Sequence, residues 1–206
     1  MNAADLDAVT LDAYGTLVTL ADPIPALADA LAERGAARSR DVVAVGFREE
    51  VAYYRAHTSE GRDENGLARL QEECAGVFLD SVGADLDAAE FGPVYAGAMH
   101  FEVLDGVAAS LERLQELGLD LAVVANWDLS LRKLLVEVGL DEYFSVIVHA
   151  AAKPAPGGFL RALEELRVEP GRVVHIGDDE VDEAAARTAG VGFLPAPVST
   201  AIAALT

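Results

Sequence analysis

The chain has 206 residues, 52% of them hydrophobic, and a formal net charge of −20 at pH 7. This length suits a domain with a lid or two small domains, with enough apolar sequence to bury a core. The acidic balance argues against a nucleic-acid partner, because phosphate binding relies on clustered Lys and Arg. Apolar runs fall short of the ~18 residues that a membrane-spanning helix needs, so no membrane association is expected either.

The single cysteine, Cys74, excludes an internal disulfide and a cysteine-based zinc site. It lies in a stretch with helical period, so we expect it to be a packing residue. The start MNAADLDAV is acidic and lacks the basic residues that open a secretory signal. We therefore expect a cytoplasmic protein, of an oligomeric state that no sequence pattern indicates.

The first predicted strand, residues 8–11, is followed by a long segment with helical rather than strand period. Residues 48–55 and 67–79 are expected to be amphipathic helices, separated by a polar turn at 61–66. Phe91-Gly92-Pro93 interrupts the pattern again. We predict an all-helical cap over residues 18–103, inserted into a core formed by 1–17 and 104–206.

The rest of the chain alternates between short apolar runs and helical segments. Further strands are predicted at 119–124, 145–148, 172–176 and 192–194. Helical stripes occupy 107–117, 131–138 and 159–166, and glycines end the first two. Near-continuous apolar strands separated by helices indicate an α/β fold with a parallel sheet covered on both faces.

Polar residues follow several of these strands. Asp12 ends the first strand before a Gly-Thr turn, Asn126 ends the second, Lys153 lies in the loop after the third, and Asp178 ends the fourth. Each has an ordinary explanation alone, such as a turn cap for Asp12 or a solvated surface position for Lys153. Because ligands gather at the carboxyl ends of parallel strands, the four together indicate one functional site.

Acidic residues crowd the turn after the fourth strand, where Asp178 is followed by Asp179, Glu180, Asp182 and Glu183. The helix dipole favours acids at a helix N-terminus, but this cluster exceeds what one cap requires. Asp178 would also share its site with the acid of the first strand, and close carboxylates are costly unless a cation neutralises them. Ligands that are all oxygen point to a hard cation, most simply Mg²⁺.

Four segments, LDAYGTL, VVANWD, KPAPGGF and HIGDDEVDEAAARTAG, occur in this order along the chain. They resemble the four motifs of the haloacid dehalogenase-like superfamily, and the resemblance covers the whole chain. It implies a Rossmann-like core with a parallel sheet flanked by helices, and a mobile helical cap. It also implies an aspartyl nucleophile that forms a covalent intermediate.

The resemblance assigns a role to residues of each motif. It implies that Asp12 is the nucleophile and that Lys153 neutralises the charge of nucleophile and substrate. Asn126, Thr16 and the cap residue Arg48 are the candidates for binding substrate.

The same resemblance implies a metal site. Its ligands would be Asp12, the backbone carbonyl of Tyr14, and Asp178. Asp182 or Glu183 would complete the set, because the spacing of the family motif allows either.

Two positions depart from the phosphatases of this family. Tyr14 stands where they carry a second Asp, the general acid and base, and a tyrosine hydroxyl ordinarily titrates near pH ~10, outside the range of a good proton shuttle. Ala125 stands where they carry a Ser or Thr that holds a phosphoryl oxygen. Loss of one such donor can lower a rate by ~10²–10³.

The string DAYGTL is itself similar to the start of the 2-haloacid dehalogenases, which need no metal. Arg48, with Phe47 beside it and Tyr54 further along, also resembles the cap helix of those enzymes. HIGDDEVD, by contrast, resembles the metal-binding form of the phosphatases.

Three hypotheses follow for a small-molecule hydrolase of unidentified substrate. We favour a Mg²⁺-dependent phosphohydrolase acting slowly on a small phosphate ester. The alternatives are a metal-free 2-haloacid dehalogenase using Asp12, and a catalytically degenerate protein that binds a ligand or partner. Sites rather than folds decide between them.

Overall fold

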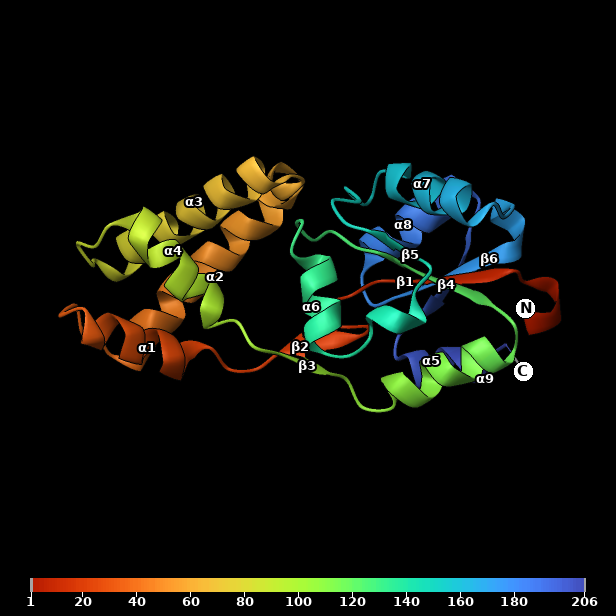
Figure 1. Ribbon diagram of the computed structural model, residues 1–206, viewed down its shortest axis with the longest axis horizontal. Coiled ribbons are helices and arrows are strands. Elements are labelled where there is room, and N and C mark those ends of the chain that lie inside the picture. The colour runs from red at the N-terminus through yellow and green to blue at the C-terminus, as the bar shows by residue number, and fades with distance from the viewer. Residues whose placement is uncertain (1, 206) are drawn as a thin grey trace. The chain divides into compact units, whose positions relative to one another are not determined.

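The computed structural model describes residues 2–205 and divides the chain into two compact units (Figure 1). Leu20–Phe101 form one unit, and the chain on either side of this segment forms the other. The predicted cap, residues 18–103, contains the first unit together with two short strands that flank it, β2 (Val18–Leu20) and β3 (Phe101–Val103).

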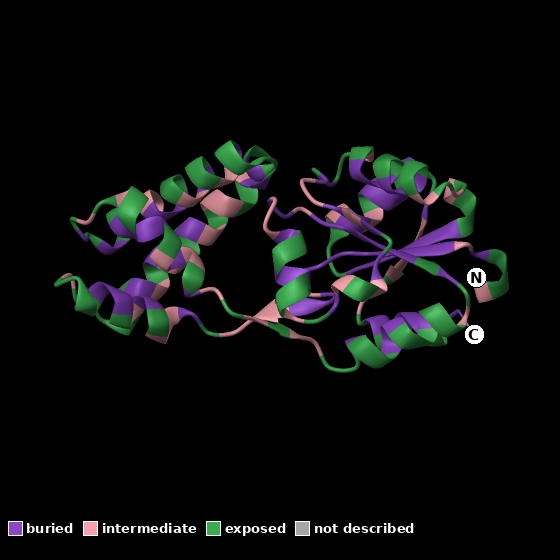
Figure 2. Cartoon of the chain, viewed as in Figure 1, coloured by how far each residue is buried: buried purple, intermediate pink, exposed green. Residues whose placement is uncertain are grey.

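The unit built from both ends of the chain contains a five-stranded sheet. Its strands are β1 (Ala8–Leu11), β4 (Asp120–Val124), β5 (Val146–Val148), β6 (Val173–Gly177) and β7 (Gly192–Pro195). They lie in the order β5-β4-β1-β6-β7, and every neighbouring pair is parallel. All residues of β1 and β6 are buried, as expected for a sheet covered on both faces (Figure 2). The predicted fold class is confirmed.

Helices cover both faces of this sheet (Figure 1). On one face α7 (Gly157–Leu166) packs beside α8 (Glu180–Ala189), and on the other α5 (Val107–Glu116) packs beside α9 (Val198–Ala203). Phe159 and the small Ala185 and Ala186 of the first pair join the strands in a core cluster. The remaining helical elements of this unit are α6 (Leu131–Glu137), η1 (Ala3–Asp5), η3 (Asp141–Tyr143) and η4 (Pro170–Arg172).

The other unit is helical. It consists of α1 (Ile24–Glu33), α2 (Arg40–His57), η2 (Thr58–Gly61), α3 (Glu64–Val82) and α4 (Ala88–Gly97). Strands β2 and β3 at its ends pair with each other, and neither was predicted because three residues are too few to show a strand period.

The predicted interruption at Phe91-Gly92-Pro93 is wrong, because these residues lie inside α4. Phe91 and Tyr95 are one turn apart, and both rings pack against Phe78 of α3, with centroids 6.0 and 4.9 Å away. A Cβ on Gly92 would lie 3.3 Å from the carbonyl oxygen of Gln71, so glycine permits the close approach of the two helices. Tertiary packing therefore overrides the local preference of Gly and Pro.

A carboxylate is buried in the helical unit. Glu50 of α2 is 5% exposed, and the hydroxyl of Tyr95 donates a 2.7 Å hydrogen bond to its Oε2. Burial raises the pKa of Glu50, although this hydrogen bond opposes the effect. The ionised form of Glu50 is therefore less favourable in the folded protein than in the unfolded chain.

Glu50→Gln is expected to flatten the pH dependence of unfolding. Folding raises the pKa of Glu50, so its contribution is fully present below the ordinary glutamate value of ~4.3 and is lost as pH rises through the folded-state value. Each unit by which the pKa differs between the folded and unfolded states corresponds to about 1.4 kcal/mol in the free energy of unfolding. Glutamine keeps an oxygen for Tyr95 and carries no charge. Urea unfolding across this pH window measures the effect.

The matched control is Glu49→Gln, an exposed neighbour on the same helix, which should keep the wild-type slope. A wild-type slope in Glu50→Gln would show that the buried carboxyl does not govern this pH dependence.

Among residues 2–205, every helix is too short or too polar to span a bilayer. The cytoplasmic location and the absence of a nucleic-acid partner stay predictions.

Candidate active site

The candidate site lies at the carboxyl ends of the parallel strands. Asp12 follows β1, Asn126 follows β4, Lys153 lies in the loop after β5, and Asp178 follows β6. The backbone N–H of Asp12 donates to the Ile176 carbonyl at 2.9 Å, so sheet-like bonding extends one residue beyond β1. The parallel topology brings to one edge side chains that are far apart in the sequence.

Lys153 is at the centre of the site, with a side chain only 2% exposed. Its Nζ donates to Asp12 Oδ1 at 2.5 Å, to Asp182 Oδ1 at 2.5 Å and to the Val124 carbonyl at 2.9 Å. An ammonium group has three N–H donors, and these contacts use all of them. The lysine is therefore a fixed buried cation, not the solvated surface residue that its loop position alone would suggest.

Asn126 holds the backbone of Lys153 in place. Its Oδ1 accepts from the Lys153 N–H at 2.7 Å, and its Nδ2 donates to the Lys153 carbonyl at 2.9 Å. The preceding Ala152 has a φ of +56°, a left-handed conformation that is uncommon outside glycine, and the Lys153–Pro154 peptide is cis. The structure thus assigns Asn126 a positioning role; its predicted contact with substrate stays a prediction.

Asp178 stands against the turn that follows Asp12. The hydroxyl of Thr16 is 3.4 Å from Asp178 Oδ1. Gly15 has a φ of +79°, and a Cβ there would lie 2.2 Å from Asp178 Oδ2. The left-handed backbone therefore favours glycine at position 15, and a side chain there would displace the Asp178 carboxylate.

Asp182 enters the site from the first turn of α8. Its Oδ2 accepts from the Asp179 N–H at 3.2 Å, completing a capping box, and the residue is 1% exposed. Gly177 makes room for it, since a Cβ there would lie 2.5 Å from Asp182 Oδ2. Glu183 is half-buried and instead pairs with Arg187 at 2.5 Å. Of the two residues that the motif allowed, Asp182 is the one beside Lys153.

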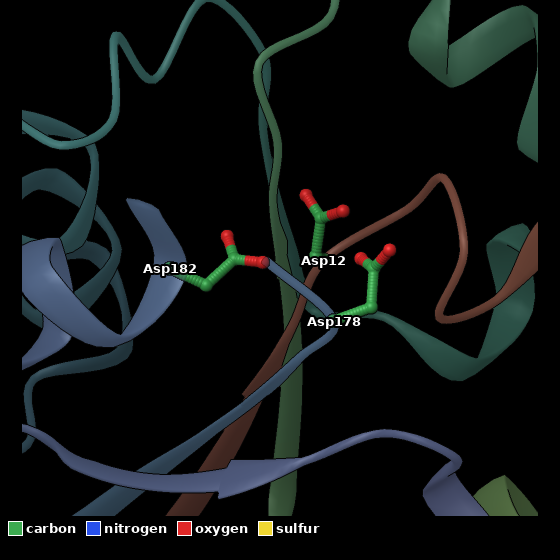
Figure 3. Close-up of side chains that lie close together, drawn as sticks. All are labelled: Asp12, Asp178 and Asp182. Carbon is green, nitrogen blue, oxygen red and sulfur yellow. The ribbon is translucent and has the colours of Figure 1, made fainter. Parts of the chain in front are cut away.

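Three carboxylates meet in this site. One oxygen from each of Asp12, Asp178 and Asp182 lies within 4.8 Å of the other two, and Figure 3 shows the three side chains close together. Burial raises the pKa of Asp12 despite the charge of Lys153, and burial together with the charge of Asp182 raises the pKa of Asp178. Three acids facing one ammonium are short of positive charge, so this oxygen-only set fits a divalent cation such as Mg²⁺.

Three other positions singled out in the sequence are Tyr14, Ala125 and Arg48. The residue at position 14, Tyr14, is 43% exposed and forms an isolated β-bridge with Val18. Ala125 is buried, and its backbone N–H donates to the Val148 carbonyl at 3.0 Å. Arg48 is exposed on α2 of the helical unit. The predicted substrate contact of Arg48 and the predicted metal contact of the Tyr14 carbonyl stay predictions.

A family model described as a haloacid dehalogenase-like hydrolase matches residues 6–190. The chain belongs to this hydrolase family. The prediction of the family, and of a hydrolase, is thereby confirmed.

Two relatives of this hydrolase differ in how much of its chain they match. Haloacid dehalogenase-like hydrolase domain-containing protein 3 of Xenopus laevis is 37% identical over 102 residues, which cover 47% of this chain and 42% of the frog protein. The matched segment thus spans less than half the length of this relative. A phosphoglycolate phosphatase of Xanthomonas campestris is 29% identical over 197 residues, covering 89% of this chain and 80% of that protein.

Among solved structures, the L-2-haloacid dehalogenase of Xanthobacter autotrophicus aligns with a TM-score of 0.64 at 23% identity, over 91% of this chain and 76% of that one. Likeness at this level of identity supports the fold. It does not decide between phosphate ester hydrolysis and dehalogenation.

Sequence reasoning missed one pair of buried polar residues. Thr10 of β1 lies 2.9 Å through its Oγ1 from Nδ1 of His175 in β6. The available signal was polarity, because a Thr and a His interrupt strands that are otherwise apolar. Their contact depends on strand register, which the sequence does not display.

Proposed function

We propose that this hydrolase is a Mg²⁺-dependent phosphohydrolase that acts slowly on a small phosphate ester. The observation that carries the proposal is the convergence of Asp12, Asp178 and Asp182 around the Lys153 ammonium. Support comes also from the phosphoglycolate phosphatase of Xanthomonas campestris, which matches 89% of the chain.

In this proposal Asp12, Asp178 and Asp182, with the Tyr14 carbonyl, hold the cation. When bound, Mg²⁺ supplies positive charge that offsets the negative charge of the phosphoryl oxygens and of the carboxylates. The donor set fits because its side-chain ligands are all carboxylate oxygens at close range.

Asp12 is the nucleophile of the proposed reaction. A carboxylate oxygen of Asp12 attacks phosphorus, an O–P bond forms, and the bond from phosphorus to the ester oxygen breaks. The leaving alkoxide takes a proton from water. A second water then attacks phosphorus, and the bond from phosphorus to the Asp12 oxygen breaks. This step releases inorganic phosphate and restores the Asp12 carboxylate, and the proton lost by the attacking water neutralises the hydroxide left by the first.

Lys153 and Asn126 prepare this step. Lys153 holds Asp12 in a single orientation and keeps a positive charge beside the attacking group, while Asn126 fixes the loop that carries the lysine. Preorganised charge of this kind is usually a large part of catalysis. The slowness follows from Tyr14 and Ala125, which lack the carboxyl and hydroxyl groups that phosphatases of the family carry at these positions.

Removal of divalent cations is expected to abolish turnover of a generic phosphate ester. The physical reason is that three ionised carboxylates repel an anionic substrate unless a cation is present. Phosphate release is measured with saturating EDTA and after Mg²⁺ is added back, and recovery is expected. As a control, Glu183→Gln should keep its Mg²⁺ requirement, because Glu183 pairs with Arg187 outside the cluster.

Equal rates with and without EDTA would overturn the metal requirement. Chloride release from 2-chloropropionate would then favour the dehalogenase hypothesis, which the DAYGTL segment with Tyr14 supports. Failure to turn over both phosphate and halide substrates would favour the ligand-binding hypothesis.

A further inference from the structure

Thr10 and His175 form a polar pair inside the sheet. They are register partners in the neighbouring strands β1 and β6, and neither is exposed. Thr10 Oγ1 lies 2.9 Å from His175 Nδ1. The other ring nitrogen, Nε2, is a buried polar atom without a hydrogen-bond partner among the described residues, and it faces Asp182 Oδ1 at 3.5 Å.

The surroundings of the ring decide which nitrogen carries the proton. A neutral imidazole has one N–H, and the other nitrogen is an acceptor. With the proton on Nδ1, the lone pair of Nε2 would face a carboxylate oxygen, which is repulsive. With the proton on Nε2, the Thr10 hydroxyl donates to Nδ1 and the N–H dipole points toward Asp182. Phe159 also packs against the His175 ring, with the two ring centroids 4.7 Å apart in a T-shaped contact.

We propose that His175, with its proton on Nε2, is a positioning residue that restrains the Asp182 carboxylate against Lys153. The separation of 3.5 Å is longer than a normal hydrogen bond, so the restraint is electrostatic. Thr10 supports it by satisfying Nδ1. This role rests on the proposed function, since it acts on catalysis only through Lys153 and Asp12.

The contacts of Asp182 explain why such a restraint matters. Asp182 Oδ1 accepts from Lys153, and Oδ2 accepts from the Asp179 N–H at the start of α8. Lys153 has no donor to spare, because its other two go to Asp12 and the Val124 carbonyl. A rotation of Asp182 would therefore shift the ammonium that orients the nucleophile. Removing a side chain that holds a metal ligand in place typically lowers metal affinity or activity by about 10–100-fold.

The first test locates the proton of the His175 ring in the metal-free wild-type protein. A ¹⁵N–¹H correlation spectrum of the histidine ring nitrogens should place the His175 proton on Nε2. A proton on Nδ1 alone would overturn the proposal. This readout requires neither activity nor metal, so it distinguishes failure of the inference from failure of the proposed function.

The second test compares His175→Met with His175→Gln. The two side chains have similar length, but only glutamine keeps an N–H for Asp182. Calorimetric titration with Mn²⁺ alone should show binding about 10–100-fold weaker in His175→Met and largely recovered in His175→Gln. His100→Met, at an exposed histidine of the helical unit, should bind Mn²⁺ as the wild type does.

Equal weakening in His175→Met and His175→Gln, in proportion to their loss of thermal stability, would show a merely structural role and overturn the proposal. If His175→Met does not fold, the ring spectrum of the wild type still decides. A wild-type protein that binds no Mn²⁺ and hydrolyses no phosphate ester would count against the proposed function, with the ring proton then deciding the inference alone.

Discussion

Lys153→Ala is expected to lower the rate of phosphate ester hydrolysis by about 10²–10³-fold or more, because it removes the only side-chain cation in direct contact with Asp12 among the described residues. The ammonium is buried and uses every donor on Asp12, Asp182 and the Val124 carbonyl. Steady-state phosphate release at saturating Mg²⁺ measures the effect.

The same change is expected to destabilise the protein. Removing one partner of a buried ion pair leaves uncompensated charge and costs roughly 3–5 kcal/mol. Because Asp12 and Asp182 are both left without the ammonium, added Mg²⁺ should restore more thermal stability to Lys153→Ala than to the wild type. Thermal unfolding with and without Mg²⁺ tests this, and equal gains in both proteins would argue against a shared cation site.

A second variant of Lys153 separates the effect of its charge from that of its packing, and a variant of an exposed lysine is the control. Lys153→Met keeps much of the apolar stem and removes the charge, so it should fold and still be inactive. Lys133→Ala should be as active as the wild type, because Lys133 is exposed and pairs with Glu137 in α6, away from the carboxylate cluster. A folded Lys153→Met protein with wild-type turnover would rule out the proposed role of the lysine.

The sheet and the convergence on its edge were predictable from the sequence. Buried parallel strands have a strong signature, which is a short apolar run, and four of the five runs predicted here lead into a polar residue of the site. Asp12 and Asp178 meet because β1 and β6 are neighbours. The choice between Asp182 and Glu183 was not made from the motif. A capping box with Asp179 turns Asp182 inward, whereas Glu183 reaches Arg187 one turn along α8.

Other features depend on tertiary contacts that local patterns do not carry. Gly92 and Pro93 look like a helix break, but the packing of Phe91 and Tyr95 on α3 keeps α4 intact. Asn126 has the residue type of a substrate ligand, yet its amide bonds to the backbone of Lys153. Both outcomes follow from the placement of one segment against another, which sequence periodicity does not record.

Tyr14→Asp is expected to raise turnover most for substrates with poor leaving groups. An alkoxide leaving group needs a proton as the ester bond breaks, and a positioned carboxyl group typically contributes about 10²–10⁴-fold. Tyr14 is 43% exposed, so aspartate can replace it without leaving a buried cavity. kcat/KM is measured for an alkyl phosphate and for a nitrophenyl phosphate, whose leaving group needs no proton.

The wild type should strongly prefer the nitrophenyl ester, and Tyr14→Asp should narrow that preference by raising the rate on the alkyl ester. Tyr14→Asn is the matched control, since it has the same shape as aspartate without the acid, and should keep the wild-type preference.

Ala125→Ser adds a hydroxyl donor at the end of β4. Combined with Tyr14→Asp, it should raise kcat/KM by up to a further factor of about 10²–10³ on both esters. If neither change raises turnover on either ester, a missing proton donor and a missing phosphoryl contact are not what limits this site.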